Sequence, residues 1–323
     1  MAIIDLTEDQ LAGYAPVREE PPDFDAFWQE TLEAVRPVPL DPVLAPVQTA
    51  LAFVDVFDVT FSGWAGDRIK GWFLVPKHVA APMPCVVEYI GYNCGRATPY
   101  QWLNAPAAGF ATLVVDNRGQ GSYLPGDTPD VMPEPTGPSG NGYLTRGVAG
   151  PHGHYYRRLM TDAVRAVEVA RAQSVVDPTR IAVCGGSQGG GLALAVGGLV
   201  GDLAAVAAQA PFLCYYRRAS QATDSDPYFE ITRYLRTNPD RVEQTFRTLS
   251  YFDAVNHAAR ITAPTLVTVP LMDDMCPPST TMAAYVHCAS DKELRVWPYG
   301  DHAGGETHSV GVLLDFLTKR LGA

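Results

Sequence analysis

Hydrophobic residues gather in short runs along most of the chain, and their lengths predict strands. Six such runs are CVVEYIG (85–91), FATLVVDNR (110–118), RIAVCGG (180–186), AAVAAQAP (204–211), PTLVTVPLMD (264–273) and ELRVWPYG (293–300). Helical patterns separate most of them, among them MTDAVRAVEVARAQ at 160–173. Nearly continuous apolar strands that alternate with helices are typical of a parallel sheet covered on both faces. The pattern therefore predicts an α/β fold with a mostly parallel central sheet.

The first part of the chain has a different pattern. The segment DFDAFWQETLEAV (23–35) places apolar residues at helical spacing and predicts a helix with one buried face. Two runs at 50–62 and 67–75, separated by GWAGD, predict a β-hairpin that adds antiparallel strands at one edge of the sheet. We expect a single domain over 1–323. Its first part, residues 1–48, is expected to be an N-terminal extension of the sheet and helix core.

Two segments interrupt the alternation of strands and helices. Residues 121–153 are rich in proline and glycine and predict a long loop. Residues 215–252 are more polar, with Tyr, Arg and Thr, and predict a small helical insertion. We expect it to lie near the face of the sheet that carries the candidate residues described next. The chain contains no internal repeat that would indicate a solenoid.

A serine surrounded by glycines stands between a predicted strand and a predicted helix. In CGGSQGGG, residues Gly185, Ser187 and Gly189 have the G-x-S-x-G spacing of a nucleophile elbow, where a tight turn lifts the serine above the sheet. A flexible linker would not be hydrophobic on both sides, and the Lys-Ser/Thr ending of a phosphate-binding loop is absent. Ser187 is therefore the candidate nucleophile.

A serine nucleophile needs a histidine base and a carboxylate that orients it. On an α/β-hydrolase sheet these residues follow the serine in the order acid, then histidine, on loops after later strands. Asp273 is the first residue after the run PTLVTVPLM and is the candidate acid, with Asp274 as the alternative. His302, in the loop GDHAGG after the last predicted strand, is the candidate base, whereas His308 belongs to the last helix.

Two backbone amides must stabilise the negative oxygen of the intermediate. The first is that of Gln188, directly after the nucleophile, and the second comes from the loop after an earlier strand. The segment IGYN (90–93) makes Tyr92 the candidate, although a tyrosine at a strand end can equally be a packing residue.

The remaining histidines give no clear metal site. His152 and His154, in PHGH, have no third ligand at a suitable spacing, so a structural role in the loop is the favoured interpretation. His78, His257 and His287 are interpreted as surface or core residues. We expect neither a metal nor a cofactor, because acyl transfer by a serine requires none.

Composition narrows the partners and the compartment. A formal net charge of −11 argues against nucleic acid and against an anionic membrane surface, since both bind basic patches. The six cysteines match no zinc spacing, and disulfides are not expected. The start MAIIDLTEDQ lacks the basic and apolar regions of a signal peptide, and no run of eighteen apolar residues occurs, so we expect a soluble cytoplasmic protein.

Several motifs together resemble one enzyme family. They are GYN (91–93), RGQGS (118–122), GGSQGGG (185–191), LSYFD (249–253) and CPPST (276–280). The chain resembles carbohydrate esterase family seven, which contains the acetyl xylan esterases and cephalosporin C deacetylases of the α/β-hydrolase superfamily. The similarity extends from DLTEDQL near the N-terminus to the last helix.

The resemblance implies a serine esterase that removes acetyl groups from small acetylated sugars such as xylo-oligosaccharides, and from cephalosporin C, through an acetyl-enzyme. It implies Ser187, Asp273 and His302 as catalytic triad and the amides of Tyr92 and Gln188 as oxyanion hole. Arg118, Gly119 and Gln120 match the RGQ motif, in which a buried arginine braces nearby loops.

The resemblance also implies an assembly and exposes one departure. The family is typically cytoplasmic and hexameric, a trimer of dimers whose active sites face an internal cavity, and the 121–153 loop would contribute to the interface or cavity wall. Such a cavity would admit small acetylated sugars and exclude polymeric xylan. Family members usually carry His-Glu at the base, whereas Ala303 follows His302 here and the nearest glutamate is Glu306.

Three other functions remain open at this point. A peptidase or an esterase for longer acyl chains could use the same fold and triad. A non-catalytic binding protein could retain the fold, and nucleotide binding could use the glycine loop.

Overall fold

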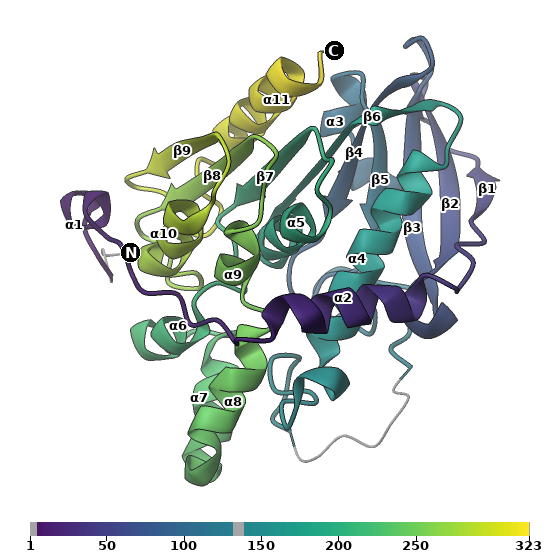
Figure 1. The fold of residues 1–323 in the computed structure, drawn as a ribbon. Coiled ribbons are helices and arrows are strands. Elements are labelled where there is room, and N and C mark those ends of the chain that lie inside the picture. Colours follow the sequence, from purple (N-terminus) through teal and green to yellow (C-terminus); the bar gives the residue numbers. More distant parts are fainter. Residues whose placement is uncertain (1–4, 132–138, 323) are drawn as a thin grey trace.

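The computed structural model describes residues 5–131 and 139–322, and these form a nine-stranded sheet with helices on both faces (Figure 1). The strand order is β1-β2-β3-β5-β4-β6-β7-β8-β9. The strands are β1 (Val43–Val47), β2 (Val54–Ser62), β3 (Arg68–Pro76), β4 (Met83–Tyr89), β5 (Ala111–Val115), β6 (Val176–Gly186), β7 (Ala205–Gln209), β8 (Thr265–Pro270) and β9 (Lys292–Trp297).

The sheet is antiparallel at one edge and parallel elsewhere. Strands β1, β2, β3 and β5 pair antiparallel in that order, whereas β5, β4 and β6 to β9 run parallel. The six apolar runs correspond to β4 to β9, and the predicted hairpin is β2 and β3. The prediction of a mostly parallel α/β sheet is therefore confirmed.

Helices pack against both faces of this sheet. Their bounds are α1 (Glu8–Ala12), α2 (Phe24–Val35), α3 (Asn104–Ala107), α4 (Tyr155–Arg171), α5 (Gln188–Leu199), α6 (Tyr216–Ala222), α7 (Phe229–Thr237), α8 (Val242–Ser250), α9 (Ala254–Ala258), α10 (Pro278–His287) and α11 (Thr307–Leu321). Single turns of 3-10 helix are η1 (Trp64–Gly66), η2 (Pro99–Gln101), η3 (Pro151–Gly153) and η4 (Pro239–Arg241). No described helix has the length and apolar character needed to cross a membrane.

Alternate residues of the central strands build two separate core layers. Cys85 and Val87 of β4 pack in the cluster that includes α2, α4 and α5, whereas Val86 packs with Phe316 and Leu317 of α11. This alternation follows from the two-residue period of a strand. Each large apolar side chain buried in this way contributes roughly 1.5–3 kcal/mol to the free energy of unfolding.

The structure differs from the sequence prediction in three elements. Strand β6 begins at Val176, four residues before the predicted run RIAVCGG (180–186). Helix α4 begins at Tyr155 and not near 160, because His154 caps it by accepting a hydrogen bond from the amide of Tyr156. Strand β1 was not predicted, and it lies within the part assigned to the N-terminal extension.

The segments that interrupt the alternation contain little strand structure. Within 121–153, residues 132–138 lie outside the described part, and the rest consists of turns, one isolated β-bridge at Leu124 and η3. The 215–252 segment contains α6, α7 and α8, of which α7 and α8 project from one end of the molecule (Figure 1).

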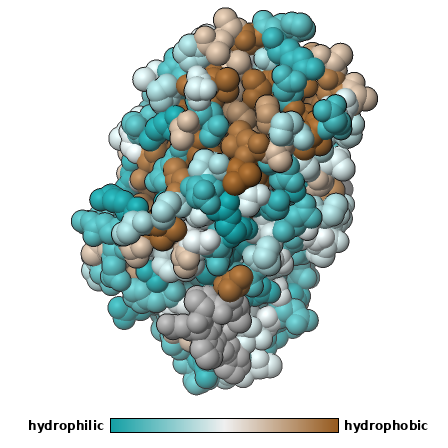
Figure 2. Space-filling model, turned by 90° about the vertical axis from the view of Figure 1, so that its right-hand side faces the viewer, coloured by the Kyte–Doolittle hydropathy of each residue, from teal (hydrophilic) through white to brown (hydrophobic). Residues whose placement is uncertain are grey.

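Apolar side chains gather on the face of the molecule that contains the edge strand β1. Figure 2 shows this face, where a group of hydrophobic residues is surrounded by polar ones. Val43 of β1 is 53% exposed, and Phe53, just before β2, is 37% exposed. An exposed apolar surface at a sheet edge is typical of a contact between protein chains.

Candidate active site

Ser187 lies at the sharp turn between β6 and α5. Its backbone has φ 55° and ψ −122°, a conformation that residues other than glycine rarely adopt. The neighbouring glycines are required because a Cβ on Gly189 would overlap the carbonyl oxygen of Tyr89. The predicted elbow geometry is therefore present, and the serine is held at the carboxyl end of the parallel strands.

Asp273 and His302 are joined by a hydrogen bond of 2.8 Å between Oδ2 and Nδ1. Asp273 is fully buried, and its other oxygen accepts the amides of Met275 and Cys276 at 2.9 and 2.8 Å. The alternative acid, Asp274, instead accepts a hydrogen bond of 3.3 Å from the hydroxyl of Ser225. The structure thus brings Asp273, and not Asp274, to the histidine.

Two opposing effects act on the protonation of His302. Burial lowers the pKa of the imidazole, but the hydrogen bond and charge of Asp273, with the charges of Asp274 and Asp301, raise it above the ordinary value of 6.5. The carboxylate also fixes the ring, so that Nε2 is left free to take a proton from a nucleophile.

Ser187 and His302 line the same cavity, which has a volume of about 320 Å³. They reach it from segments more than a hundred residues apart in the chain. Within the described residues no direct hydrogen bond joins them, and such catalytic contacts are often long until substrate is bound. The cavity wall also contains Ala303, Glu306 and Ser309.

The two backbone amides proposed from the sequence as oxyanion hole are those of Gln188 and Tyr92. Gln188 is the first residue of α5, and Tyr92 lies in the loop after β4. Neither amide donates a hydrogen bond to another residue of the described chain. Free amides at a helix N-terminus next to a nucleophile can hold a developing negative oxygen.

The sequence matches a family model described as acetyl xylan esterase (AXE1) over residues 1–320. The chain belongs to the acetyl xylan esterase family. Two solved members of this family share its fold. An acetyl xylan esterase from Paenibacillus sp. R4 is 38% identical with a TM-score of 0.92, covering 98% of this chain and 100% of that one. Acetyl xylan esterase 1 from Thermoanaerobacterium sp. is 31% identical with a TM-score of 0.90, covering 98% and 99%.

A curated relative is longer than this chain. The acetyl esterase Axe7A of Xylanibacter ruminicola is 28% identical over 300 residues, which are 89% of this chain and 64% of that protein. The chain therefore spans about 64% of the length of this relative. The likeness to acetyl xylan esterases confirms both the resemblance drawn from the motifs and the α/β-hydrolase fold.

Arg118, the arginine of the RGQ motif, is fully buried and does not line the cavity of Ser187. The Arg118 guanidinium donates to both oxygens of Asp162 at 2.6 and 2.8 Å, and to Asp67 at 2.8 Å. The next residue, Gly119, has φ 67° and donates its amide to the carbonyl of Thr128 at 2.7 Å. Arg118 and Gly119 thus brace the loop after β5.

Gln120, the third residue of the motif, contacts the two segments that carry the candidate oxyanion-hole amides, those of Tyr92 and Gln188. Its Oε1 accepts the amide of Asn93 at 2.7 Å, and its Nε2 donates to Oε1 of Gln188 at 2.9 Å. The Gln188 side chain, itself fully buried, also accepts the hydroxyl of Tyr156 at 2.9 Å. These hydrogen bonds fix the loop that carries Tyr92 relative to the elbow.

The other histidines pack in ways that leave them outside the site. His154 is buried, its Nε2 lies 2.9 Å from the carbonyl of Leu144, and burial lowers its pKa to about 4. His152 packs edge-on against the ring of Phe27. His287 contacts the carbonyl of Pro16 at 2.8 Å, and His78 is exposed. The structural role inferred for the PHGH histidines agrees with these contacts.

Asp273, Cys276 and His302 place potential metal ligand atoms within 4.8 Å of one another. Burial raises the pKa of the Cys276 thiol well above its usual range, so the sulfur stays protonated. Asp273 already uses both oxygens in hydrogen bonds, one of them to His302. This donor set suits an acid and base pair better than a cation.

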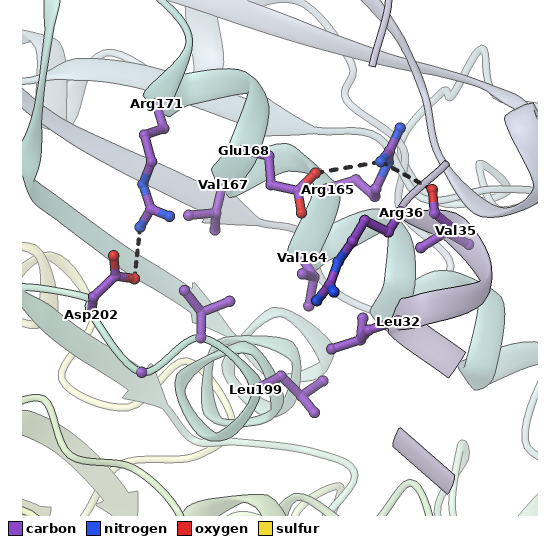
Figure 3. A pocket seen from close by; sticks show the side chains of 12 residues that line it. Leu32, Val35, Arg36, Val164, Arg165, Val167, Glu168, Arg171, Leu199 and Asp202 are labelled. Carbon is purple, nitrogen blue, oxygen red and sulfur yellow. Dashed lines mark hydrogen bonds and ion pairs between the residues drawn. The ribbon is translucent and has the colours of Figure 1, made fainter. Parts of the chain in front are cut away.

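A second cavity, of about 290 Å³, lies between α2, α4 and the end of α5 (Figure 3). Arg171 pairs there with Asp202 at 2.8 Å, and Arg165 with Glu168 at 3.4 Å. Neither Ser187 nor His302 lines it. Ser187 and His302 line the cavity of about 320 Å³ instead.

Sequence analysis missed one charged residue that contacts the site. Glu230 of α7 is only 4% exposed and accepts a hydrogen bond from the hydroxyl of Tyr92. Its sequence context, FEITRYLRT, has the appearance of a surface helix. Its spacing from Tyr92 in the sequence gave no signal of the contact.

Proposed function

We propose that this chain is a serine esterase that hydrolyses acetyl esters of small acetylated sugars, such as xylo-oligosaccharides, and similar compounds such as cephalosporin C. The observation that supports it most strongly is the 2.8 Å hydrogen bond between Asp273 and His302 beside the cavity lined by Ser187. Membership of the acetyl xylan esterase family supports the choice of acyl group.

The proposed reaction has two halves. His302 Nε2 takes the proton of Ser187 as its oxygen attacks the acetyl carbonyl carbon, and the amides of Tyr92 and Gln188 stabilise the resulting oxyanion. The intermediate collapses, the ester bond breaks, and His302 gives the proton to the leaving alcohol. Water, deprotonated by His302, then attacks the acetyl-enzyme and releases acetate and free Ser187.

The acyl group can be tested by comparing p-nitrophenyl acetate, butyrate and octanoate, with acetylated xylo-oligosaccharide as a natural substrate. The proposal predicts that kcat/KM is highest for acetate and that acetate is released from the oligosaccharide. A preference for butyrate or octanoate would favour an esterase of the same fold with another acyl specificity. Cleavage of acylated peptides in place of esters would favour a peptidase.

We also propose that the chain forms a homo-oligomer, a hexamer by its resemblance to the family, and acts in the cytoplasm. The exposed apolar face beside β1 supports an interface between copies (Figure 2). All six cysteines are free, which suits a reducing compartment. Light scattering coupled to gel filtration gives the assembly mass, and a monomer at micromolar concentration would contradict the oligomer.

A further inference from the structure

Glu230 of α7 is a buried carboxylate. It is 4% exposed, and within the described residues it forms no ion pair. Arg233, one turn further along α7, pairs with Asp226 at 2.6 Å instead. Because burial of a carboxylate without a partner costs free energy, its retention at this position calls for compensating hydrogen bonds.

Those hydrogen bonds come from two segments that adjoin the active site. One oxygen of Glu230 accepts the hydroxyl of Tyr92, and the other accepts the amide of Leu144 at 3.0 Å. The backbone at Gly142 approaches so closely, with φ 103°, that a Cβ there would overlap the Glu230 carboxylate. Helix α7, the loop after β4 and the 142–144 segment therefore meet at this carboxylate.

The Tyr92 side chain is held from further directions. Its hydroxyl accepts the amide of Tyr143 at 2.7 Å while it donates to Glu230. Its ring packs edge-on against Tyr143 and Phe212, with centroids 5.5 and 5.7 Å away. A tyrosine held at both ring and hydroxyl restrains the backbone from which its side chain extends.

We infer that Glu230 is a positioning residue, which holds Tyr92 through its hydroxyl so that the Tyr92 amide points at the oxyanion. This inference rests on the proposed function, in which that amide stabilises the transition state. A donor contributes only when it lies about 2.7–3.1 Å from the oxygen, so loss of the hydroxyl anchor lowers the rate without removing a group that touches substrate.

Protonation of Glu230 gives a second readout. Burial raises the pKa of its carboxyl to about 7, although the bonds from Tyr92 and Leu144 lower it. The groups that face it are Asp226 and Arg233 on its own side and Tyr92, Tyr143 and Tyr156 opposite. The ionised form accepts both donors, so the acid limb of kcat should involve Glu230 as well as His302.

The test compares Glu230→Gln, Tyr92→Phe and the double variant on p-nitrophenyl acetate. The control is Glu243→Gln on α8, whose side chain is 83% exposed and paired with Arg217. Each single variant should lower kcat about tenfold or more, with KM changed less than about threefold. Glutamine has one acceptor oxygen and cannot accept both the Tyr92 hydroxyl and the Leu144 amide. The double variant should lose no more than Tyr92→Phe alone, because Glu230 acts on catalysis only through that hydroxyl. The acid limb should become less steep in Glu230→Gln.

Two results would contradict the positioning role of Glu230. Unchanged kcat in Glu230→Gln and Tyr92→Phe, or losses that multiply in the double variant, would overturn the inference. Melting temperatures show whether each variant is folded, and if Glu230→Gln is not, Tyr92→Phe alone decides by its kcat and KM. Ser187→Ala distinguishes failure of the positioning role from failure of the proposed function. If Ser187→Ala abolishes turnover while Tyr92→Phe does not lower kcat, the esterase function stands and the positioning role of Glu230 fails. If Ser187→Ala retains turnover, the proposed function itself fails.

Discussion

The side-chain amide of Gln120 donates a hydrogen bond of 2.9 Å to Oε1 of Gln188, and joins the loop after β5 to the first residue of α5. Gln120 also accepts the amide of Asn93, next to Tyr92, at 2.7 Å. One buried side chain therefore connects the two segments that carry the amides of the proposed oxyanion hole. We therefore expect Gln120 to act on the proposed site by positioning these two segments.

Replacement of Gln120 should disturb both segments together. In Gln120→Ala the amide of Asn93 and the side chain of Gln188 lose a buried partner, which costs about 1–3 kcal/mol in the free energy of unfolding. The loss of alignment should also reduce kcat for an acetyl ester about tenfold. Gln221→Ala, at an exposed position of α6, is the matched control and should change neither quantity. Full kcat in Gln120→Ala would show that the link has no role in catalysis.

The pH dependence of kcat/KM should report His302. The pKa of this imidazole is raised above 6.5, and only the neutral ring can take the serine proton. Activity should therefore fall as the pH decreases through a value above 6.5. In Asp273→Asn the ring loses the carboxylate, so the apparent pKa should decrease and kcat should fall by orders of magnitude. A wild-type profile that stays flat down to pH 5 would be inconsistent with a histidine base.

Glu306 should impose a charge preference on the leaving alcohol. It is the single carboxylate among the residues that line the cavity of Ser187, and no lysine or arginine lines it. In the proposed reaction His302 protonates the leaving alcohol, which places the alcohol on the His302 side of the cavity. Glu306 should repel an anionic alcohol there.

Phenyl acetate and 4-acetoxybenzoate measure this preference with a neutral and an anionic alcohol. Glu306→Gln should raise kcat/KM for the anionic ester relative to the neutral one by about three- to tenfold at low salt. The difference should shrink with added salt, since the side chain is exposed. A ratio that is identical in wild type and variant would remove Glu306 from alcohol selection.

His257 should make the protein more sensitive to acid. Its ring is buried against Phe24 and Trp28, neither nitrogen has a partner, and burial lowers its pKa to about 3. The unfolded chain binds a proton near pH 6.5 that the folded chain binds only near pH 3, so stability from this residue decreases as the pH falls between them.

Urea unfolding at pH 7 and pH 4 measures this contribution. Relative to wild type, His257→Phe should gain on the order of 3 kcal/mol in the free energy of unfolding between these two values. The comparison needs the variant because Asp253 and Glu230, whose pKa values burial raises to about 7, change stability in the opposite direction. A difference between the two proteins that is the same at both pH values would refute the assignment.

The elbow and the acid and base could be predicted because their signals are local. Ser187 stands at the junction of an apolar strand and an apolar helix. The five glycines around it in CGGSQGGG are the local signal for that turn. Asp273 and His302 lie in the loops after β8 and β9, and parallel strands bring their carboxyl ends to one edge of the sheet. The order of the three residues along the chain, Ser187, Asp273 and His302, is also the order known for this fold.

Other features depend on distant contacts and could not be predicted from the sequence. Strand β1 contains Pro46 and is partly exposed along its length, so it lacks a strand signal and is stabilised by pairing with β2. The first turn of α4 contains Arg158, which is polar in the sequence but buried by its ion pair with Asp130 at 3.0 Å. Glu230 is 138 residues from Tyr92 in the chain, and only the packing of α7 brings them together.

The central claim is that Ser187 is the nucleophile of an acetyl esterase. The most direct measurement compares initial rates of wild type and Ser187→Ala on p-nitrophenyl acetate, with circular dichroism to show that the variant is folded. The account predicts a decrease in kcat on the order of 10⁴ or more. A folded Ser187→Ala that keeps most of the wild-type rate would contradict it.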